Sequence, residues 1–362
     1  MPSVGFVWAA RGGPVVSRRA PFGRAGAKIV GVFDRLLNLI IKATNIQPIY
    51  TPEHCLVVTK SVGGCTVCKD VCPHEAITIS RQVEIDDVDC TGCGLCVQAC
   101  PSQALASSTS FQPGGPLRCS QVKGSAQSVQ CLTRLEPSDL LRLAGRKDKV
   151  TLVRNECEGC KVGGAAVPEH LEKTVQKARA LAAVRGRALT AEVKQAAHYD
   201  VLDDPDVLSR RDLLRGGVRG TQRFSADLLA PLEVFGDTQA EEKGVPEELE
   251  RELLLIRAAD PEPQTLVPWT LPRVHEGCIM CPVCTNVCPT DAFRRELTPV
   301  KEGGGGTLKL EPERCNGCNA CVRSCPVKVI TLDANVTYGE LSGGTQDVYR
   351  KAGGSKGTLA RT

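Results

Sequence analysis

The chain has 362 residues, a formal net charge of +4, 20 cysteines and only 4% aromatic residues. This length predicts more than one domain, because single hydrophobic cores stop growing beyond about 250–300 residues. So few aromatic side chains leave the interior short of large apolar groups, and we expect something other than carbon to fill part of it. The mild charge gives no support for nucleic-acid binding, and no apolar run reaches the roughly 18–20 residues of a membrane span.

The cysteines recur at fixed spacings. Three groups, which begin at Cys90, Cys278 and Cys315, follow the pattern C-x2-C-x2-C-x3-C-P, and a variant group begins at Cys55 with a nine-residue gap. The sequences after each Cys-Pro pair also match, so the chain holds a fourfold internal repeat in two pairs: CPHEAI, CPSQAL, CPTDAF and CPVKVI. Disulfides do not explain cysteine triplets at a constant phase. Zinc sites pair two CxxC units, without a third cysteine or a trailing Cys-Pro.

This pattern resembles the signature of bacterial-type 4Fe–4S ferredoxins. Three cysteines at this spacing let one tight loop place three thiolates on three corners of a cubic cluster. The fourth cysteine lies too far along the chain to complete the same cube, so the resemblance implies that it ligates the neighbouring cluster. The nine-residue gap after Cys55 departs from the family pattern, and we expect an insertion that contains Gly63 and Gly64 and enlarges this loop.

The resemblance therefore implies four 4Fe–4S clusters with crossed ligation. In the first pair, one cluster would use Cys55, Cys65, Cys68 and Cys100. The other would use Cys72, Cys90, Cys93 and Cys96. In the second pair, the expected ligand sets are Cys278, Cys281, Cys284 and Cys325 for one cluster, and Cys288, Cys315, Cys318 and Cys321 for the other.

Four further cysteines, Cys119, Cys131, Cys157 and Cys160, follow neither ferredoxin nor zinc-finger spacing. The pattern around them predicts strands at 129–132 and 150–153 and helices at 137–144 and about 167–183, which is a small α/β unit. These cysteines sit at predicted strand ends, where such sheets place their ligands. We expect a fifth 4Fe–4S cluster here, since twenty cysteines divide into five sets of four. Zinc, a 2Fe–2S cluster and unligated thiols remain the alternatives.

The predicted fold class is α+β, with two ferredoxin-like βαββαβ dicluster domains flanking a small α/β cysteine-bearing domain and a helical linker. Strands are expected at 76–79, 83–85 and 307–310, and a helix at 246–258. The predicted divisions are a basic disordered N-terminus with an amphipathic helix (1–44), the first dicluster domain (45–112), the α/β domain (113–200), the helical linker (201–265), the second dicluster domain (266–336) and a flexible tail (337–362).

Two segments bear on location. Ser17-Arg18-Arg19, followed by an apolar stretch at 29–41, resembles a twin-arginine export signal, but Asp34 and Arg35 interrupt that stretch. A second Ser-Arg-Arg segment, at 209–215, is similar to segments of NapF-like ferredoxins. We expect a cytoplasmic protein, with twin-arginine export or peripheral membrane attachment as the alternative.

The resemblance implies a polyferredoxin that relays single electrons between redox partner proteins. It would serve as a subunit or donor of an oxidoreductase that carries a flavin, molybdopterin or hydrogenase centre. The alternative is an iron–sulfur enzyme with a catalytic cluster at the middle cysteines. The sequence offers little for that alternative, because it has no nucleotide-binding glycine motif and its five histidines are scattered. No catalytic residue is assigned.

Cluster binding should reverse the sign of the protein's charge. Each oxidised 4Fe–4S cluster with four thiolates carries a formal charge of −2, so five clusters would change +4 to roughly −6. We therefore expect the anaerobically reconstituted protein to bind an anion exchanger near neutral pH, despite its sequence pI of 8.2. Elution of the iron-loaded protein as a cation would contradict this.

Overall fold

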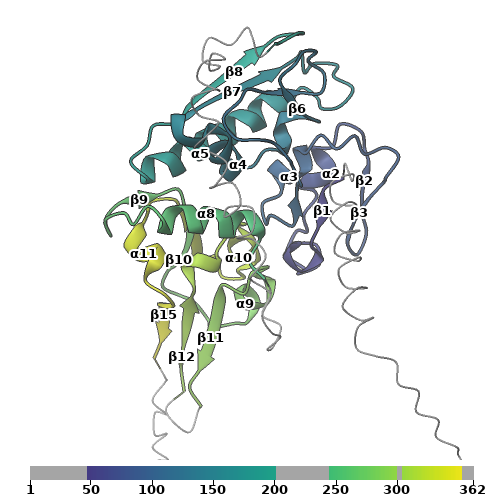
Figure 1. Cartoon of the computed structure of the whole chain (residues 1–362). Helices are drawn as coiled ribbons and strands as arrows, with labels where there is room; N and C mark the ends of the chain where they lie inside the picture. The colour runs from purple at the N-terminus through teal and green to yellow at the C-terminus, as the bar shows by residue number, and fades with distance from the viewer. Residues whose placement is uncertain (1–46, 201–243, 300–303, 353–362) are drawn as a thin grey trace, which may run out of the picture. The chain divides into compact units, whose positions relative to one another are not determined.

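The computed structural model describes residues 47–200, 244–299 and 304–352 (Figure 1). All of these residues belong to one compact unit. The predicted N-terminal helix, the basic N-terminus and both Ser-Arg-Arg segments lie outside the described residues. Within the described ranges, no helix is long and apolar enough to cross a membrane.

The first cysteine-rich segment contains short elements in the order strand, helix, strand, strand, helix, strand. They are β1 (Ile49–Tyr50), the 3₁₀ helix η1 (Pro52–His54), α2 (Val67–Asp70), β2 (Ile77–Ile79), β3 (Val83–Ile85), α3 (Leu95–Ala99) and β4 (Leu105–Ala106). Strand β1 pairs with β4 and β2 pairs with β3, both antiparallel. The strands predicted at 76–79 and 83–85 are confirmed as this second pair.

The last cysteine-rich segment repeats this order with longer strands. Its elements are β10 (Leu271–Val274), α9 (Val283–Val287), β11 (Phe293–Leu297), β12 (Gly306–Leu310), the 3₁₀ helix η7 (Pro312–Arg314), α10 (Ala320–Ser324) and β13 (Ile330–Asp333). Strand β10 pairs with β13 and β11 with β12, again antiparallel. A two-residue pair, β9 (Leu266–Val267) with β14 (Val336–Thr337), flanks them. The strand predicted at 307–310 is confirmed as β12.

The fourfold repeat is also visible in the backbone. In every repeat the third residue after the fourth cysteine adopts a left-handed conformation, although none of the four is glycine: Glu75, Gln103, Asp291 and Lys328, with φ between 52° and 55°. Side chains other than glycine rarely take this conformation. Its recurrence at the same position shows that the four motifs share one local turn.

The prediction of a flexible tail from residue 337 is wrong for its first part. Helix α11 (Tyr338–Ser342) starts with a capping box, in which the Glu340 N–H donates to Thr337 Oγ1 at 3.3 Å. Strand β15 (Gln346–Lys351) then pairs antiparallel with β12 and so covers an otherwise unpaired strand edge. The Gly, Ser and Lys residues around this strand gave no strand pattern. The strand forms because it pairs with β12, which lies far from it in the sequence.

The middle segment forms a four-stranded sheet in the order β6-β5-β7-β8, with all strands parallel. Its elements are β5 (Leu117–Cys119), β6 (Gln127–Val129), the 3₁₀ helices η2 (Leu132–Arg134) and η3 (Gly145–Lys147), α4 (Pro137–Ala144), β7 (Lys149–Arg154), α5 (Val167–Val184) and β8 (Thr190–Gln195). Both predicted helices and the strand at 150–153 are confirmed. The strand predicted at 129–132 ends at Val129, where the chain turns into η2, and the sequence did not predict β5 and β8.

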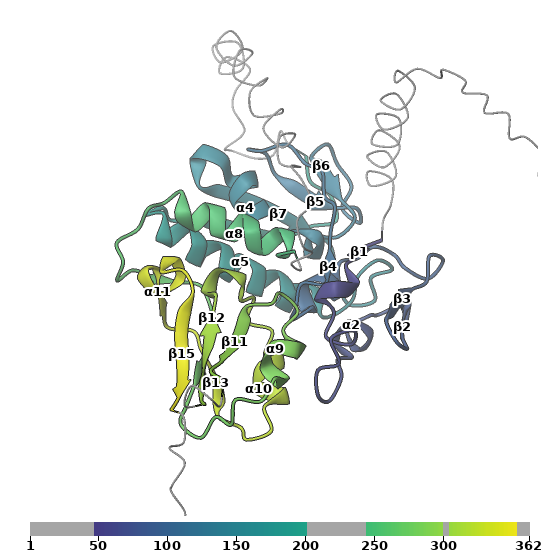
Figure 2. The ribbon, with the colours of Figure 1, turned by 90° about the horizontal axis from the view of Figure 1, so that it is seen from below.

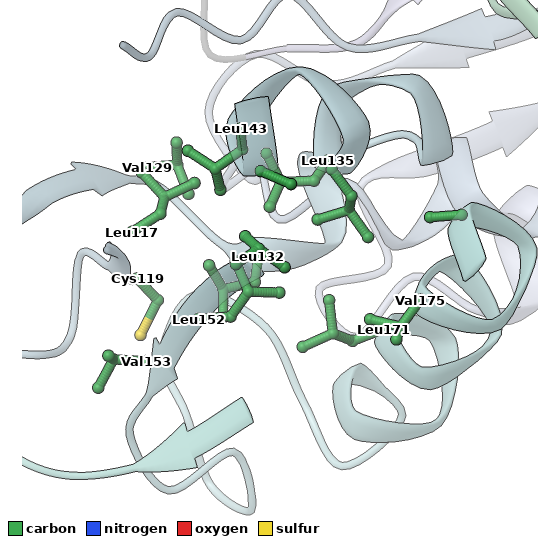
Figure 3. Packing of buried hydrophobic residues seen from close by; sticks show 14 of the residues in the cluster. Leu117, Cys119, Val129, Leu132, Leu135, Leu143, Leu152, Val153, Leu171 and Val175 are labelled. Atoms are coloured by element: carbon green, nitrogen blue, oxygen red, sulfur yellow. The ribbon is translucent and has the colours of Figure 1, made fainter. Parts of the chain in front are cut away.

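Leucine side chains fill the core of this sheet domain, as Figure 3 shows. Leu117, Leu132, Leu135 and Leu152 are fully buried. The shortage of aromatic residues is therefore met by close-packed leucine and valine here, and not by metal as the composition suggested. The domain has a conventional hydrophobic core of its own.

Helix α8 (Glu247–Arg257) confirms the predicted helix at 246–258 and packs against α4 and α5 (Figure 2). Two of its four acidic residues, Glu248 and Glu252, are buried at this contact. Glu248 accepts hydrogen bonds from Ser138 N at 2.9 Å and Ser138 Oγ at 2.5 Å, and Glu252 forms an ion pair with Lys177 at 2.7 Å. The predicted linker of 201–265 therefore contains a helix that is an integral part of the fold.

Replacing Leu152 with alanine should destabilise the sheet domain. Leu152 is fully buried on the central strand β7, so its truncation leaves a cavity and should lower the opening free energy by about 2–5 kcal/mol. Hydrogen exchange of the β5 and β7 amides measures this. Val193→Ala on β8, at a position 38% exposed, is the matched control and should change protection by less than about 0.5 kcal/mol. Equal effects of the two substitutions would argue against this core.

Candidate metal centres

The structure brings the cysteines of the first repeat pair together in the two crossed sets. Site 2 consists of Cys72, Cys90, Cys93 and Cys96, which line one cavity of about 20 Å³. Site 3 consists of Cys55, Cys65, Cys68 and Cys100, which line another cavity of about 20 Å³. In each set, three cysteines come from one motif and the fourth from the other.

Cys55 occupies the place of a regular first cysteine in spite of the nine-residue gap. A 3₁₀ helix precedes it, and its N–H donates to Pro52 O at 3.0 Å. Cys315, the first cysteine of a regular motif, follows an equivalent 3₁₀ helix and donates to Pro312 O at 3.0 Å. The insertion therefore lies after the first ligand position and leaves that position unchanged.

In the second repeat pair, the interactions between thiolates show that Cys288 lies beside the cysteines of the other motif. Burial raises the pKa of Cys315 to about 12, and the thiolates of Cys288 and Cys318 contribute to that rise. Cys288 therefore groups with the other motif, and site 4 consists of Cys288, Cys315, Cys318 and Cys321. Burial, followed by the charges of Cys281 and Cys278, raises the pKa of Cys284 to about 12. These three cysteines define site 5. Cys325, its predicted fourth member, is buried in the same core cluster as Cys284.

The four middle cysteines also converge, and they form site 1. Cys119 ends β5, while Cys131 and Cys157 follow β6 and β7, so these three lie at the carboxyl ends of neighbouring parallel strands. Cys160 is in the loop after Cys157. All four line one cavity of about 20 Å³, the same size as the cavity at site 3. The predicted strand-end position is confirmed, and the space matches those of the motif cysteines.

The chemistry of these donor sets fits a cationic metal–sulfide core. None of the twenty cysteines is in a disulfide. Burial, helped by neighbouring thiolates, raises the pKa of Cys68 and of Cys93 to about 11. Because the thiolate is the form that binds metal, four buried thiolates facing one space need positive charge between them. Bound iron would supply that charge, and the residues present are suited to hold it.

Backbone N–H groups supply the remaining polarity around the sulfurs. Hydrogen bonds from the backbone of Gly92 and Leu95 counteract the burial that raises the pKa of Cys90 and of Cys93. In the second domain, Gly317 and Ala320 make the equivalent bonds to Cys315 and Cys318 at the same two-residue offset. Gly92 and Gly317 are both left-handed, with φ of 67° and 69°, which turns the following backbone toward the sulfur. Such hydrogen bonds tune the potential of an iron–sulfur cluster.

The five sites follow one another in a row. Burial is the main cause of the raised pKa of Cys93, Cys96, Cys318 and Cys321, and each also responds to a thiolate of the next site. Cys131 of site 1 acts on Cys93 of site 2, and Cys68 of site 3 acts on Cys96 of site 2. Cys100 of site 3 acts on Cys318 of site 4, and Cys284 of site 5 acts on Cys321 of site 4.

The enlarged loop after Cys55 makes the contact between sites 3 and 4. Val62 N donates to Ser324 Oγ at 3.0 Å, and Arg323 Nη2 donates to Val62 O at 3.1 Å. Leu56 is buried in a cluster that includes Cys318. The Asn316 side chain, between two ligands of site 4, also donates to the carbonyl of Ser102 at 2.9 Å. The departure from the regular spacing thus joins the two cysteine-rich domains.

Sequence reasoning missed two polar residues between sites 1 and 2. Thr133 Oγ1 lies 2.7 Å from the carbonyl oxygen of Cys93 and 3.3 Å from Cys131 Sγ. Arg134 is buried beside it and donates to the carbonyl of Gly92 at 3.0 Å. Their closeness to Cys131 in the sequence was the available signal. Two of the scattered histidines, His54 and His74, bond to backbone carbonyls, which gives them a structural role.

Comparison with known proteins supports this reading. A family model described as a 4Fe–4S dicluster domain matches residues 63–104 and 277–334. The chain therefore carries two 4Fe–4S dicluster domains, one in each cysteine-rich segment. No protein of known structure matches the chain.

Curated relatives align with parts of the chain. The ferredoxin-type protein NapF of Haemophilus influenzae is 40% identical over 77 residues, 20% of this chain and 42% of that protein. The polyferredoxin protein MvhB of Methanothermobacter marburgensis is 38% identical over 61 residues, 16% of this chain and 15% of that protein. The thiosulfate reductase electron transfer subunit PhsB of Salmonella typhi is 33% identical over 90 residues, 25% of this chain and 43% of that protein. The chain thus spans less than half the length of each of these relatives.

Metal analysis tests the donor sets directly. Five 4Fe–4S clusters would give about 20 irons per chain after anaerobic purification, since each cluster holds four. Replacing Cys157 and Cys160 with serine should remove about four irons and leave the others, because both residues belong to site 1 alone. About 16 irons with one zinc in the unmodified chain would contradict a cluster at site 1.

Proposed function

We propose that this chain is a polyferredoxin with five 4Fe–4S clusters, one at each of the five sites, and that it passes single electrons between redox partner proteins. The observation that carries the proposal is the unbroken row of cysteine sets. Each successive pair of sites shares one packed cluster of side chains, which holds Cys131 with Cys93, Cys96 with Cys68, Cys65 with Cys318, and Cys321 with Cys284. A chain built for a single cluster would need no such row.

We infer that both cysteine-rich segments are ferredoxin-like βαββαβ domains. Two observations support this: the order of their elements, and the pairing of the first strand with the last and of the two middle strands with each other. The crossing of the fourth cysteines, seen at sites 2, 3 and 4, supports the same ligation at site 5 with Cys325.

Site 1 is proposed to hold the fifth 4Fe–4S cluster. Its cavity of about 20 Å³ equals those of sites 2 and 3. A single zinc ion needs four ligands around one point, with sulfur at about 2.3 Å, and the described residues hold no group of three such ligands arranged around one metal ion. Val162 N donates to Cys160 Sγ at 3.4 Å, which is the kind of backbone contact that cluster sulfurs receive.

In electron transfer of this kind, the protein only has to position, polarise and shield the clusters. When bound, a 4Fe–4S cluster takes up and releases one electron at a potential that its surroundings set. The cysteines hold the sites in order, the backbone N–H groups stabilise negative charge on the sulfurs, and the buried side chains keep water away. No side chain needs to act as an acid or a base.

The partners and location follow from the same proposal. The names of several relatives describe electron-transfer or oxidoreductase subunits, among them PhsB and an aliphatic sulfonate oxidoreductase polyferredoxin-like subunit of Pyrococcus furiosus. We propose that this chain likewise serves an oxidoreductase with a flavin, molybdopterin or hydrogenase centre. Twenty cysteines without disulfides suit a reducing compartment, so we propose a cytoplasmic location.

A reductive titration tests the relay. Under nitrogen, the fully loaded chain should take up about five electrons from a low-potential donor such as titanium(III) citrate, one for each cluster. Electron paramagnetic resonance (EPR) spectra should then show splitting from magnetic coupling between neighbouring reduced clusters. The chain with Cys157→Ser and Cys160→Ser should take up about four electrons and serves as the control. Five electrons with uncoupled spectra would contradict the row, and uptake of two or fewer would contradict the function.

A further inference from the structure

Arg134 is a buried arginine at the junction between sites 1 and 2. Its side chain is 5% exposed, and it ends the 3₁₀ helix η2, which begins directly after Cys131. It comes from the sheet domain, but its hydrogen bonds reach the first dicluster domain. Nη1 donates to the carbonyl of Gly92 at 3.0 Å, and Nη2 donates to the carbonyl of Ser108 at 2.9 Å.

The hydrogen bond to Gly92 places the guanidinium group against a ligand loop. Gly92 lies between Cys90 and Cys93, two cysteines of site 2. The next glycine in that loop, Gly94, has a φ of 85°, and a Cβ atom there would lie 2.8 Å from Thr133 O and 3.0 Å from Arg134 Cα. Glycine at this position therefore permits the backbone of residues 133–134 to approach the loop closely.

Thr133 connects the same junction to the other site. Its hydroxyl lies 2.7 Å from the carbonyl of Cys93 in site 2 and 3.3 Å from Cys131 Sγ in site 1. The two consecutive residues thus hold the ligand loops of both sites against each other. Their hydrogen bonds define where the guanidinium charge sits.

The charge itself faces anionic groups on both sides. Burial lowers the pKa of Arg134, and the thiolates of Cys90, Cys93, Cys131 and Cys96 raise it. Three of these cysteines belong to site 2 and one to site 1. A guanidinium group stays protonated in proteins, so a fixed positive charge acts on both sites at once. In a buried setting this charge is weakly screened by solvent and salt.

We propose that Arg134 sets the reduction potentials of sites 1 and 2 together. Adding one electron changes the formal charge of a cluster and its four thiolates from −2 to −3, with no bond formed or broken and the electron supplied by an external donor. A fixed positive charge stabilises the more negative state, so both potentials lie higher than they would without it. Arg134 is therefore a positioning and potential-setting residue at one end of the row. This inference rests on the proposed function.

The test is a potentiometric titration followed by EPR on the loaded full-length chain. Arg134→Gln removes the charge and keeps hydrogen-bond donors, so two of the five potentials should shift to more negative values while the other three stay in place. Arg134→Lys keeps the charge and should hold both potentials near their original values. The chain with Cys157→Ser and Cys160→Ser identifies the signal that belongs to site 1.

Arg323→Gln provides the matched control. Arg323 donates to the carbonyls of Val62 and Gly64 at the contact between sites 3 and 4, so its replacement should leave the potentials of sites 1 and 2 unchanged. Unchanged potentials in the Arg134→Gln chain would overturn the proposal. Equal shifts in the Gln and Lys chains would also overturn it, because they would assign the effect to packing instead of charge.

A second variant covers the case in which Arg134→Gln does not fill with iron. Ser108 is exposed, and its carbonyl accepts from Arg134 Nη2. Ser108→Asp adds a negative charge near the guanidinium at a position where folding should be unaffected, and it should lower the same two potentials. No shift in a fully loaded Ser108→Asp chain would then overturn the proposal. An unmodified chain that holds far fewer than about 20 irons would instead contradict the proposed function.

Discussion

The whole arrangement depends on the repulsion between buried thiolates. Each set of cysteines faces one small space, and burial with mutual repulsion raises the pKa of Cys284, Cys315 and Cys318 to about 12. Such a set is stable as thiolates when positive metal lies between the sulfurs. The regular structure around sites 2 and 3 is slight, since β1 and β4 have two residues each. Metal ligation must therefore supply much of the folding free energy of these domains, as it does in other small metal-binding domains.

The sheet domain does not depend on metal ligation in the same way for its stability. It has its own leucine core, and Cys119 lies at the edge of that core, as Figure 3 shows. Site 1 is therefore attached to the ends of a preformed parallel sheet, whereas the other sites are built from loops and short helices. A rigid scaffold at one end of the row can hold Thr133 and Arg134 in place against site 2.

Hydrogen bonds hold both junctions between domains, but different elements supply them. Between sites 1 and 2, buried side chains from the sheet domain reach the backbone of a ligand loop. Between sites 3 and 4, the inserted loop around Val62 meets helix α10 through Ser324 and Arg323. In both cases hydrogen bonds fix ligand loops of separate domains against each other, and this turns three cysteine-bearing units into one row.

The local features of the sites were predictable because they depend on short stretches of chain. The spacing of the cysteines indicated the crossed sets at sites 2 and 3, and the pattern from Pro137 to Ala144 predicted helix α4 to the residue. Strands β5, β8 and β15 escaped prediction because each is stabilised by a partner strand that the short pattern does not reveal. The tail was misjudged from its polar composition for the same reason.

The amino-acid sequence was enough to determine the kind of metal site, the grouping of most ligands and the number of repeats. These properties follow from thiolate chemistry and from spacings of two or three residues. The convergence of Cys119 and Cys131 with Cys157, the order of the five sites and the burial of Arg134 were decided by the packing of distant segments. Such contacts join residues that lie tens to hundreds of positions apart, and no periodicity in the chain encodes which of them will meet.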